Sequence, residues 1–452
     1  MTGSGRRSVP SPSTPPHRPT RSSLRTRPGK RPRSLPLRGA ALVTAAVLSG
    51  AAGLTGCGAL QSFTGGSGGS RAPLTVMTWA PEDTRATNMP GMPAMAQAYA
   101  RWVNSRGGIG GRELRVLTCN ERNDSRAAGD CARRAVAEGV AAVVGSYSQN
   151  GRAFMAPLEA AGIPYIGGYG VSADEFTSYL SYPVNGGQAA LLAGNGVQLA
   201  ASCARVSLVR PDTIAGDQLR YLLNSGLSQG TRDTATDIPA AEDAGEYTEA
   251  AEQARREAGK RGGCVTAALG ERTQHFFDSF RRLPSDGRAI RVSSVLGSVD
   301  QPLVDRTGGA HGPFEGAYIT GWYPDAGDAR WNPMKRVIRA HAFGDNRIDP
   351  ADAGVQTTWI AYTVLRAAVE SLGDKDVTPH RLSYTLNRGV TVDTGGLTPR
   401  LRWRYEDLLG MPGYPRIVNR DVTFQVVRAG RLVAQRQGFV DVGRTLRDVS
   451  YG

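Results

Sequence analysis

Hydroxyl, amide and phenol side chains are concentrated in two short loops near the middle of the chain. The loops contain Ser146, Ser148 and Gln149, and then Gly168 and Tyr169. Hydroxyl and amide groups can hold a polar ligand, and glycines let the backbone come close to it. The residue types therefore indicate a small-molecule site, although two ordinary polar loops would have the same composition.

Each of the two loops follows an apolar run of strand length, at 140–144 and at 163–166. A helical pattern with an apolar face separates the two runs, and Gly162 ends it. A strand, a helix and a strand in this order predict a parallel β-α-β unit. Ligands of such sheets bind beyond the carboxyl ends of the strands. Both loops lie there, and the free N–H groups at the start of the helix favour an anionic group.

Strands and helices alternate along most of the chain. Strands are expected at 74–78, 113–118, 140–144, 163–166, 205–209, 234–238, 265–269, 289–296 and 317–322, and short strands and turns from 395 to 427. Helices are expected at 94–105, 125–138, 216–227, 246–260 and 354–372, and a further helix contains Phe276, Phe277 and Phe280. The alternation predicts an α/β fold with two doubly wound lobes of similar size. Two lobes imply a cleft, which is a preferred position for a ligand. The aromatic residues of the helix at 354–372 are expected in the core.

The basic charge of the chain is concentrated at its N-terminus. The net charge is +14, but the first 56 residues hold ten Lys or Arg and no acid, which leaves +4 for the rest. No basic stripe interleaved with aromatic residues occurs, so we expect no nucleic-acid partner. Residues 1–38, which are rich in Arg, Pro and Ser, have the composition of a disordered segment.

The uncharged run GAALVTAAVLSGAAGL at 39–54 has the length of a signal-peptide core with basic flanks. The next residues, ending in Gly56 and Cys57, resemble the cleavage box of bacterial lipoproteins. This resemblance implies that 1–56 is removed, that Cys57 is lipidated, and that the protein is held at the outer face of the cell membrane. A plain secretory signal or an uncleaved anchor are the alternatives. The Gly/Ser-rich residues 57–72 predict a flexible tether.

Four short motifs have the order and spacing of a known family. They are GGIGGR at 107–112, VVGSYS at 143–148, AGIPYI at 161–166 and GGLTP at 395–399. They resemble the type I periplasmic binding proteins, above all the leucine/isoleucine/valine-binding group that serves ABC importers. The resemblance implies a two-lobe domain at 73–442, a hinge, a small ligand in the cleft, and a permease and ATPase as partners. It places lobe 1 at about 73–197 and 318–378, lobe 2 at about 198–317 and 379–442, and a tail at 443–452.

The resemblance also implies roles for individual residues. In the amino-acid binders of the family, the loop after the third strand holds a ligand carboxylate, and Ser146, Ser148 and Gln149 occupy that place. The next loop is usually rich in Ser and Thr, whereas here Gly168 and Tyr169 stand in it. This departure favours a ligand other than a standard branched-chain amino acid.

Further ligand contacts are expected from the first strand and from the second lobe. Trp79 occupies the position where, in the family, the loop after the first strand reaches the cleft. Asp212 or Glu271 could face the ammonium group of a ligand, and Trp322 and Tyr323 could pack on its apolar part. The alternative for the second-lobe residues is a solvated loop position.

The chain has five cysteines, and four remain if Cys57 is lipidated. Four cysteines allow three pairings, and export permits disulfides. Cys119 ends a strand and Cys131 lies on the following helix, whereas Cys203 and Cys264 precede two strands at matching ends. We therefore expect the pairs Cys119–Cys131 and Cys203–Cys264. A zinc site is the alternative, but no C-x-x-C spacing supports it.

No catalytic, metal or cofactor motif accompanies these features. The five histidines form no H-E-x-x-H, and neither a P-loop nor a Rossmann G-x-G-x-x-G after a strand occurs. We expect a monomeric binding protein for an amino-acid-like or amide-like solute, without catalytic activity, metal or cofactor. A ligand-sensing lipoprotein of the same fold, acting without a transporter, is the alternative, and an enzyme is the third possibility.

Overall fold

The computed structural model describes residues 71–84, 87–213, 215–230, 233–241, 244–259, 262–284 and 290–451. These residues belong to one compact unit, Gly68–Gly452. The expected signal segment, Cys57 and nearly all of the tether lie outside the described residues. Among the helices described, none is long and apolar enough to cross a membrane.

The first lobe is built on a five-stranded sheet with the order β2-β1-β3-β4-β5. Its strands are β1 (Arg71–Ala80), β2 (Arg112–Asn120), β3 (Ala142–Val144), β4 (Tyr165–Ile166) and β5 (Ser181–Tyr182). All neighbouring strands are parallel, as the β-α-β pattern predicts. Val144 pairs with Ile166 at the ends of β3 and β4, so the two loops of interest leave the sheet side by side.

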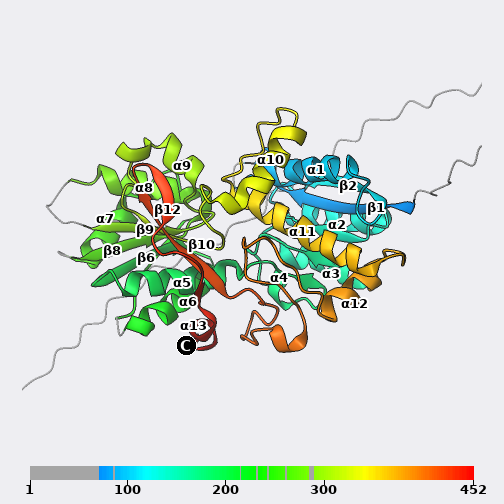
Figure 1. Cartoon of the computed structure of the whole chain (residues 1–452). Coiled ribbons are helices and arrows are strands. Elements are labelled where there is room, and N and C mark those ends of the chain that lie inside the picture. Colours follow the sequence, from blue (N-terminus) through cyan, green and yellow to red (C-terminus); the bar gives the residue numbers. More distant parts are fainter. Residues whose placement is uncertain are drawn as a thin grey trace, which may run out of the picture. The chain divides into compact units, whose positions relative to one another are not determined.

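Helices cover this sheet because each has an apolar face that must be buried. They are α1 (Gly91–Asn104), α2 (Ser125–Ala137), α3 (Gly151–Ala161), α4 (Asp174–Thr177), α10 (Asn332–His341), α11 (Ala353–Leu372) and α12 (Pro379–Asn387). Helix α1 packs on α11, and α2 packs on α3 (Figure 1). Trp359 and Tyr362 of α11 are buried, and both rings contact Tyr99 of α1. The expected core role of these aromatic residues is confirmed.

The second lobe contains an eight-stranded sheet that follows the order β12-β11-β10-β9-β8-β6-β7, with β13 paired to β11. Its strands are β6 (Arg205–Pro211), β7 (Thr236–Ala240), β8 (Gly263–Ala267), β9 (Arg291–Val295), β10 (Tyr318–Gly321), β11 (Asp421–Arg428), β12 (Arg431–Ala434) and β13 (Val440–Asp441). Strand β10 is parallel to β9 and antiparallel to β11. Strand β10 therefore belongs to the second sheet, and the chain leaves this sheet after Gly321 and continues to α10 and α11.

The helices of the second lobe are α5 (Gly187–Ala200), α6 (Leu219–Leu227), α7 (Thr248–Ala258), α8 (Thr273–Arg282), α9 (Gln301–Arg306) and α13 (Gly443–Arg447). Helices α5 and α6 pack together, and α13, which lies in the expected tail, contacts both (Figure 1). The two lobes and their parallel strands are those of the predicted fold class.

Both expected disulfides are present. Cys119 of β2 is bonded to Cys131 of α2, with their Cα atoms 5.8 Å apart. Cys203, which precedes β6, is bonded to Cys264 of β8, with their Cα atoms 5.7 Å apart. Each bridge lies within one lobe.

Candidate functional site

The hydroxyl groups of the first loop are buried and have partners within the protein. The backbone N–H of Trp79 donates to Ser146 Oγ at 3.0 Å. Ser148 Oγ donates to Glu121 Oε2 at 2.9 Å and accepts from the backbone N–H of Asn150 at 3.0 Å. Both serines thus hold the loop in its conformation. Gln149 is exposed and donates to the hydroxyl of Tyr147 at 3.0 Å.

Glu121, which contacts the loop of Ser146, Ser148 and Gln149, was not among the residues predicted from the sequence. It follows the last residue of β2, has no exposed surface, and also accepts from Asn150 Nδ2 at 3.3 Å. Burial raises the pKa of its carboxyl group, and the hydrogen bond from Ser148 offsets part of this rise. Its position just beyond the carboxyl end of a parallel strand was the available signal.

A second buried carboxylate fixes the loop that carries Gly168 and Tyr169. Glu175 accepts from the backbone N–H groups of Gly170 at 3.1 Å, Val171 at 3.1 Å and Ser172 at 2.9 Å. Burial raises the pKa of Glu175 to about 7. A Cβ atom on Gly168 would lie 2.0 Å from Glu175 Oε2. Gly168 is therefore required for the close approach of this carboxylate to the loop.

Tyr169 lies where residues of the two lobes meet. Its ring is 5.1 Å from the ring of Tyr147 and 5.2 Å from that of Trp322, measured between centroids. A Cβ atom on Gly297, which follows β9, would lie 2.5 Å from the Tyr169 hydroxyl. Only 3% of the surface of Tyr169 is exposed, and its hydroxyl has no hydrogen-bond partner among the described residues.

The structure brings Trp322 and Tyr323 to the same place. Both are buried directly after β10, and their ring centroids are 6.0 Å apart. Trp322 Nε1 donates to the carbonyl oxygen of Gly187 at 2.9 Å. The hydroxyl of Tyr323 is 3.0 Å from Thr357 Oγ1 of α11 and accepts from Asn185 Nδ2 at 3.1 Å. These residues are buried in the structure and are not solvated loop positions.

Two carboxylates cap helices beside these rings. Asp352 accepts from the backbone N–H of Val355 at 2.8 Å in the first turn of α11. Asp300 accepts from the backbone N–H of Leu303 at 2.9 Å in the first turn of α9. Both negative charges act on Tyr169 and, after burial, help to raise the pKa of its hydroxyl. Burial, followed by the charge of Asp300, raises the pKa of Asp352 to about 7. We call these six residues the interlobe site: Tyr147, Tyr169, Asp300, Trp322, Tyr323 and Asp352.

The remaining residues expected at the ligand are Trp79, Asp212 and Glu271. Trp79 is part of β1, and its buried indole packs against Phe154 and Tyr165 in a core cluster separate from that of Tyr169. Asp212 is exposed directly after β6. Glu271 lies in a short 3₁₀ helix, Gly270–Arg272, and its side chain is outside the described residues.

A family model described as "Periplasmic binding protein" matches residues 84–407. The chain belongs to the periplasmic binding protein family. Its two-lobe α/β fold is that of the type I periplasmic binding proteins. A search among curated proteins finds no match.

Solved structures of this family have the same fold as the chain at low sequence identity. A substrate-binding periplasmic protein from Ralstonia solanacearum is 16% identical over 80% of this chain and 100% of its own, with a TM-score of 0.65. A leucine binding protein from Thermotoga maritima is 14% identical over 81% of this chain and 99% of its own, with a TM-score of 0.63. A solute binding protein of an ABC transporter from R. palustris, solved in complex with 4-hydroxybenzoate, is 12% identical over 82% and 97%, with a TM-score of 0.65.

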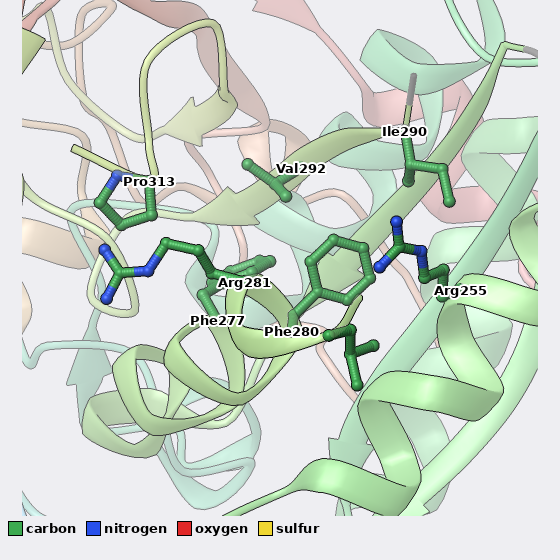
Figure 2. A pocket seen from close by; sticks show the side chains of 8 residues that line it. Arg255, Phe277, Phe280, Arg281, Ile290, Val292 and Pro313 are labelled. Atoms are coloured by element: carbon green, nitrogen blue, oxygen red, sulfur yellow. The ribbon is translucent and has the colours of Figure 1, made fainter. Parts of the chain in front are cut away.

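Two surface hollows of this periplasmic binding protein lie outside the interlobe site. One, of about 310 Å³, lies at the amino-terminal side of the first sheet and is lined by Arg71, Arg112 and Asp374. The other, of about 280 Å³, lies between α7, α8 and β9. Figure 2 shows Phe280 at its centre, with Arg255 and Arg281 on opposite sides.

Metal ligands are not grouped in the part of the chain that the structure describes. No set of three or more His, Cys, Asp or Glu there has the arrangement of a metal site. The cysteines expected as an alternative zinc site are engaged in the two disulfides instead.

Proposed function

We propose that this protein is the extracytoplasmic solute-binding lipoprotein of an ABC importer, and that it binds a small solute at the interlobe site. Members of its family bind small molecules and work with ABC transporters. The relatives with known ligands include binders of leucine and of aromatic acids. The protein acts in this proposal as a binder rather than as a catalyst.

One observation supports this proposed position of the ligand. The Tyr169 hydroxyl is buried among rings from both lobes and has no partner among the described residues. Leaving a buried hydroxyl unpaired costs about 1–3 kcal/mol, so a ligand that pairs with it would recover this free energy. A solute at this point would touch both lobes and would favour the conformation in which they meet.

The roles of the first-loop residues remain part of this proposal. The hydroxyls of Ser146 and Ser148 are occupied by Trp79 and Glu121, so we propose that they shape the wall of the site. Trp322 and Tyr323 would supply apolar contact to the ligand, and Gln149 is available at the exposed rim.

A thermal-shift screen of the full-length chain tests the function. The compounds should include amino acids, amides, aromatic acids, amines and nucleosides. A true ligand at 100 times its Kd should stabilise the protein by about 2.7 kcal/mol, which would appear as a clear rise in Tm. The proposal fails if no compound of any class raises the Tm while the protein gives a cooperative unfolding transition.

A further inference from the structure

We propose that the solute is a cation: a small amine without a carboxylate of its own, whose ammonium group lies beside Tyr169 and between Asp300 and Asp352. This inference rests on the proposed solute-binding function and specifies the chemical class of the ligand. It differs from the expectation of an amino acid held by its carboxylate in the first loop.

The rings of the interlobe site provide the first argument. Tyr147, Tyr169, Trp322 and Tyr323 form a continuous set, with neighbouring centroids 5.1, 5.2 and 6.0 Å apart. The faces of aromatic rings carry negative potential and attract cations, most strongly where water is excluded. The unpaired hydroxyl of Tyr169 can accept a hydrogen bond from an ammonium group.

Acidic residues on elements of both lobes provide the second argument. Asp300 caps α9 of the second lobe, three residues after the Gly297 that meets Tyr169. Asp352 caps α11, whose Thr357 and Thr358 contact Tyr323 and Gly145. Neither carboxylate forms an ion pair with a described residue. The positive charge that acts on Asp300 is that of Arg306, which is exposed and therefore screened by water.

The third argument comes from the acidic residues around the loop after β3, where a ligand carboxylate was expected. Glu121 and Glu175 are buried there without a described ion-pair partner. A Cβ atom on Gly151, the first residue of α3, would lie 2.6 Å from Asp174 Oδ2. The amino-terminal end of α3 is therefore approached by a carboxylate from α4. A second anion beside this loop would be repelled.

Proton linkage gives the proposal a distinctive signature. An ammonium group beside Asp352 would favour the ionised carboxylate and lower its pKa, which burial and then the charges of Asp300 and Asp349 raise to about 7. Binding of an amine near pH 7 must then release protons, whereas binding of an anion would take them up.

The test is calorimetry of the full-length chain with pairs of compounds of the same shape and opposite charge. The first pair is 4-hydroxybenzylamine and 4-hydroxybenzoate, and the second is isobutylamine and isobutyrate. We expect an amine to bind at least about tenfold more tightly than its paired acid. Titrations in two buffers of different ionisation enthalpy should show proton release. Tighter binding of the acids, or proton uptake, overturns the inference and leaves the solute-binding function standing.

Variants test the position of the charge. Asp352→Asn retains a side-chain oxygen that can cap α11, so the fold should be preserved. We expect it to weaken amine binding at least about tenfold and to reduce proton release. The matched control is Asp393→Asn, because Asp393 accepts from the backbone N–H of Gly395 in an exposed turn. Equal amine affinity in the wild type and in Asp352→Asn overturns the placement. If no compound of a broad screen binds, the proposed function fails with it.

Discussion

At the scale of single residues, the loop after β4 is organised by one buried carboxylate. Glu175 accepts three backbone N–H groups and so fixes the backbone that follows Tyr169. This arrangement requires Gly168, because any side chain at that position would meet Glu175 and Tyr165. The Gly-Gly-Tyr-Gly sequence differs from the Ser/Thr-rich loop of the amino-acid binders for two reasons. Its glycine at 168 makes room for the carboxylate of Glu175, and its tyrosine places a phenol in the site.

Substituting Gly168→Ala should destabilise the protein by about 1–3 kcal/mol, because the new Cβ atom would lie 2.0 Å from Glu175 Oε2 and 2.3 Å from a ring carbon of Tyr165. Urea denaturation measures the change. The control is Gly245→Ala, where a Cβ atom would meet nothing within 4 Å. If Gly168→Ala and the control have equal stability, Glu175 does not hold the loop in the position described.

The raised pKa of Glu175 predicts a pH dependence of stability. Its folded-state pKa of about 7 is above its ordinary value of 4.5, so the folded protein binds a proton between these pH values that the unfolded chain releases. The contribution of Glu175 therefore falls as pH rises from 4.5 to 7, by at most about 1.4 kcal/mol per pH unit. The stability of the wild type relative to Glu175→Gln should be higher at pH 5 than at pH 7.5. Parallel stability profiles for the two proteins would contradict this assignment.

At the scale of elements, the apolar runs located the strands well because a central parallel strand is buried on both faces. Thus β3, β6 and β9, which are central strands, lie at or within a few residues of their expected positions. Helix α5 was not expected. Its sequence is apolar and small on nearly every side, and 12 of its 14 residues are buried, so it shows no amphipathic pattern.

The candidate site was predictable only in part. The positions of Tyr169, Trp322 and Tyr323 after strands marked them as candidates, and the structure brings all three together. The capping roles of Asp300 and Asp352 give no signal of a site in the sequence, because two helices from distant parts of the chain must first bring them to Tyr169. Trp79 was expected at the cleft, but β1 continues through it to Ala80 and directs its ring to Phe154.

The two disulfides should contribute unequally to stability. Cys119 and Cys131 are 12 residues apart, whereas Cys203 and Cys264 are 61 apart. Chain entropy predicts losses of about 3 and about 4 kcal/mol when each pair is replaced by alanine. Urea denaturation of the two double variants, each compared with the wild type, measures both losses. Equal stability of all three proteins would show that neither bridge constrains the unfolded chain.

At the scale of the whole molecule, the proposal joins a two-lobe binding domain to a lipid anchor through a flexible tether. The Cys57→Ala variant should lack the lipid and should move from the membrane fraction to the soluble extracytoplasmic fraction when the protein is produced in a bacterial host. Mass spectrometry of the wild type should show an acylated Cys57 at the new N-terminus. A wild-type chain without acylation, or a variant that stays with the membrane, would contradict the lipoprotein proposal.

The central claim is that a solute binds between the lobes at Tyr169, and calorimetry on Tyr169→Phe tests it most directly. This variant keeps the ring that packs on Tyr147 and Trp322 and removes only the unpaired hydroxyl. With a ligand identified by the screen, the wild type should bind one molecule per chain. The variant should bind it at least about tenfold more weakly, since a hydrogen bond to a charged group contributes about 1.5–3 kcal/mol. An unchanged affinity in Tyr169→Phe would show that the solute binds elsewhere.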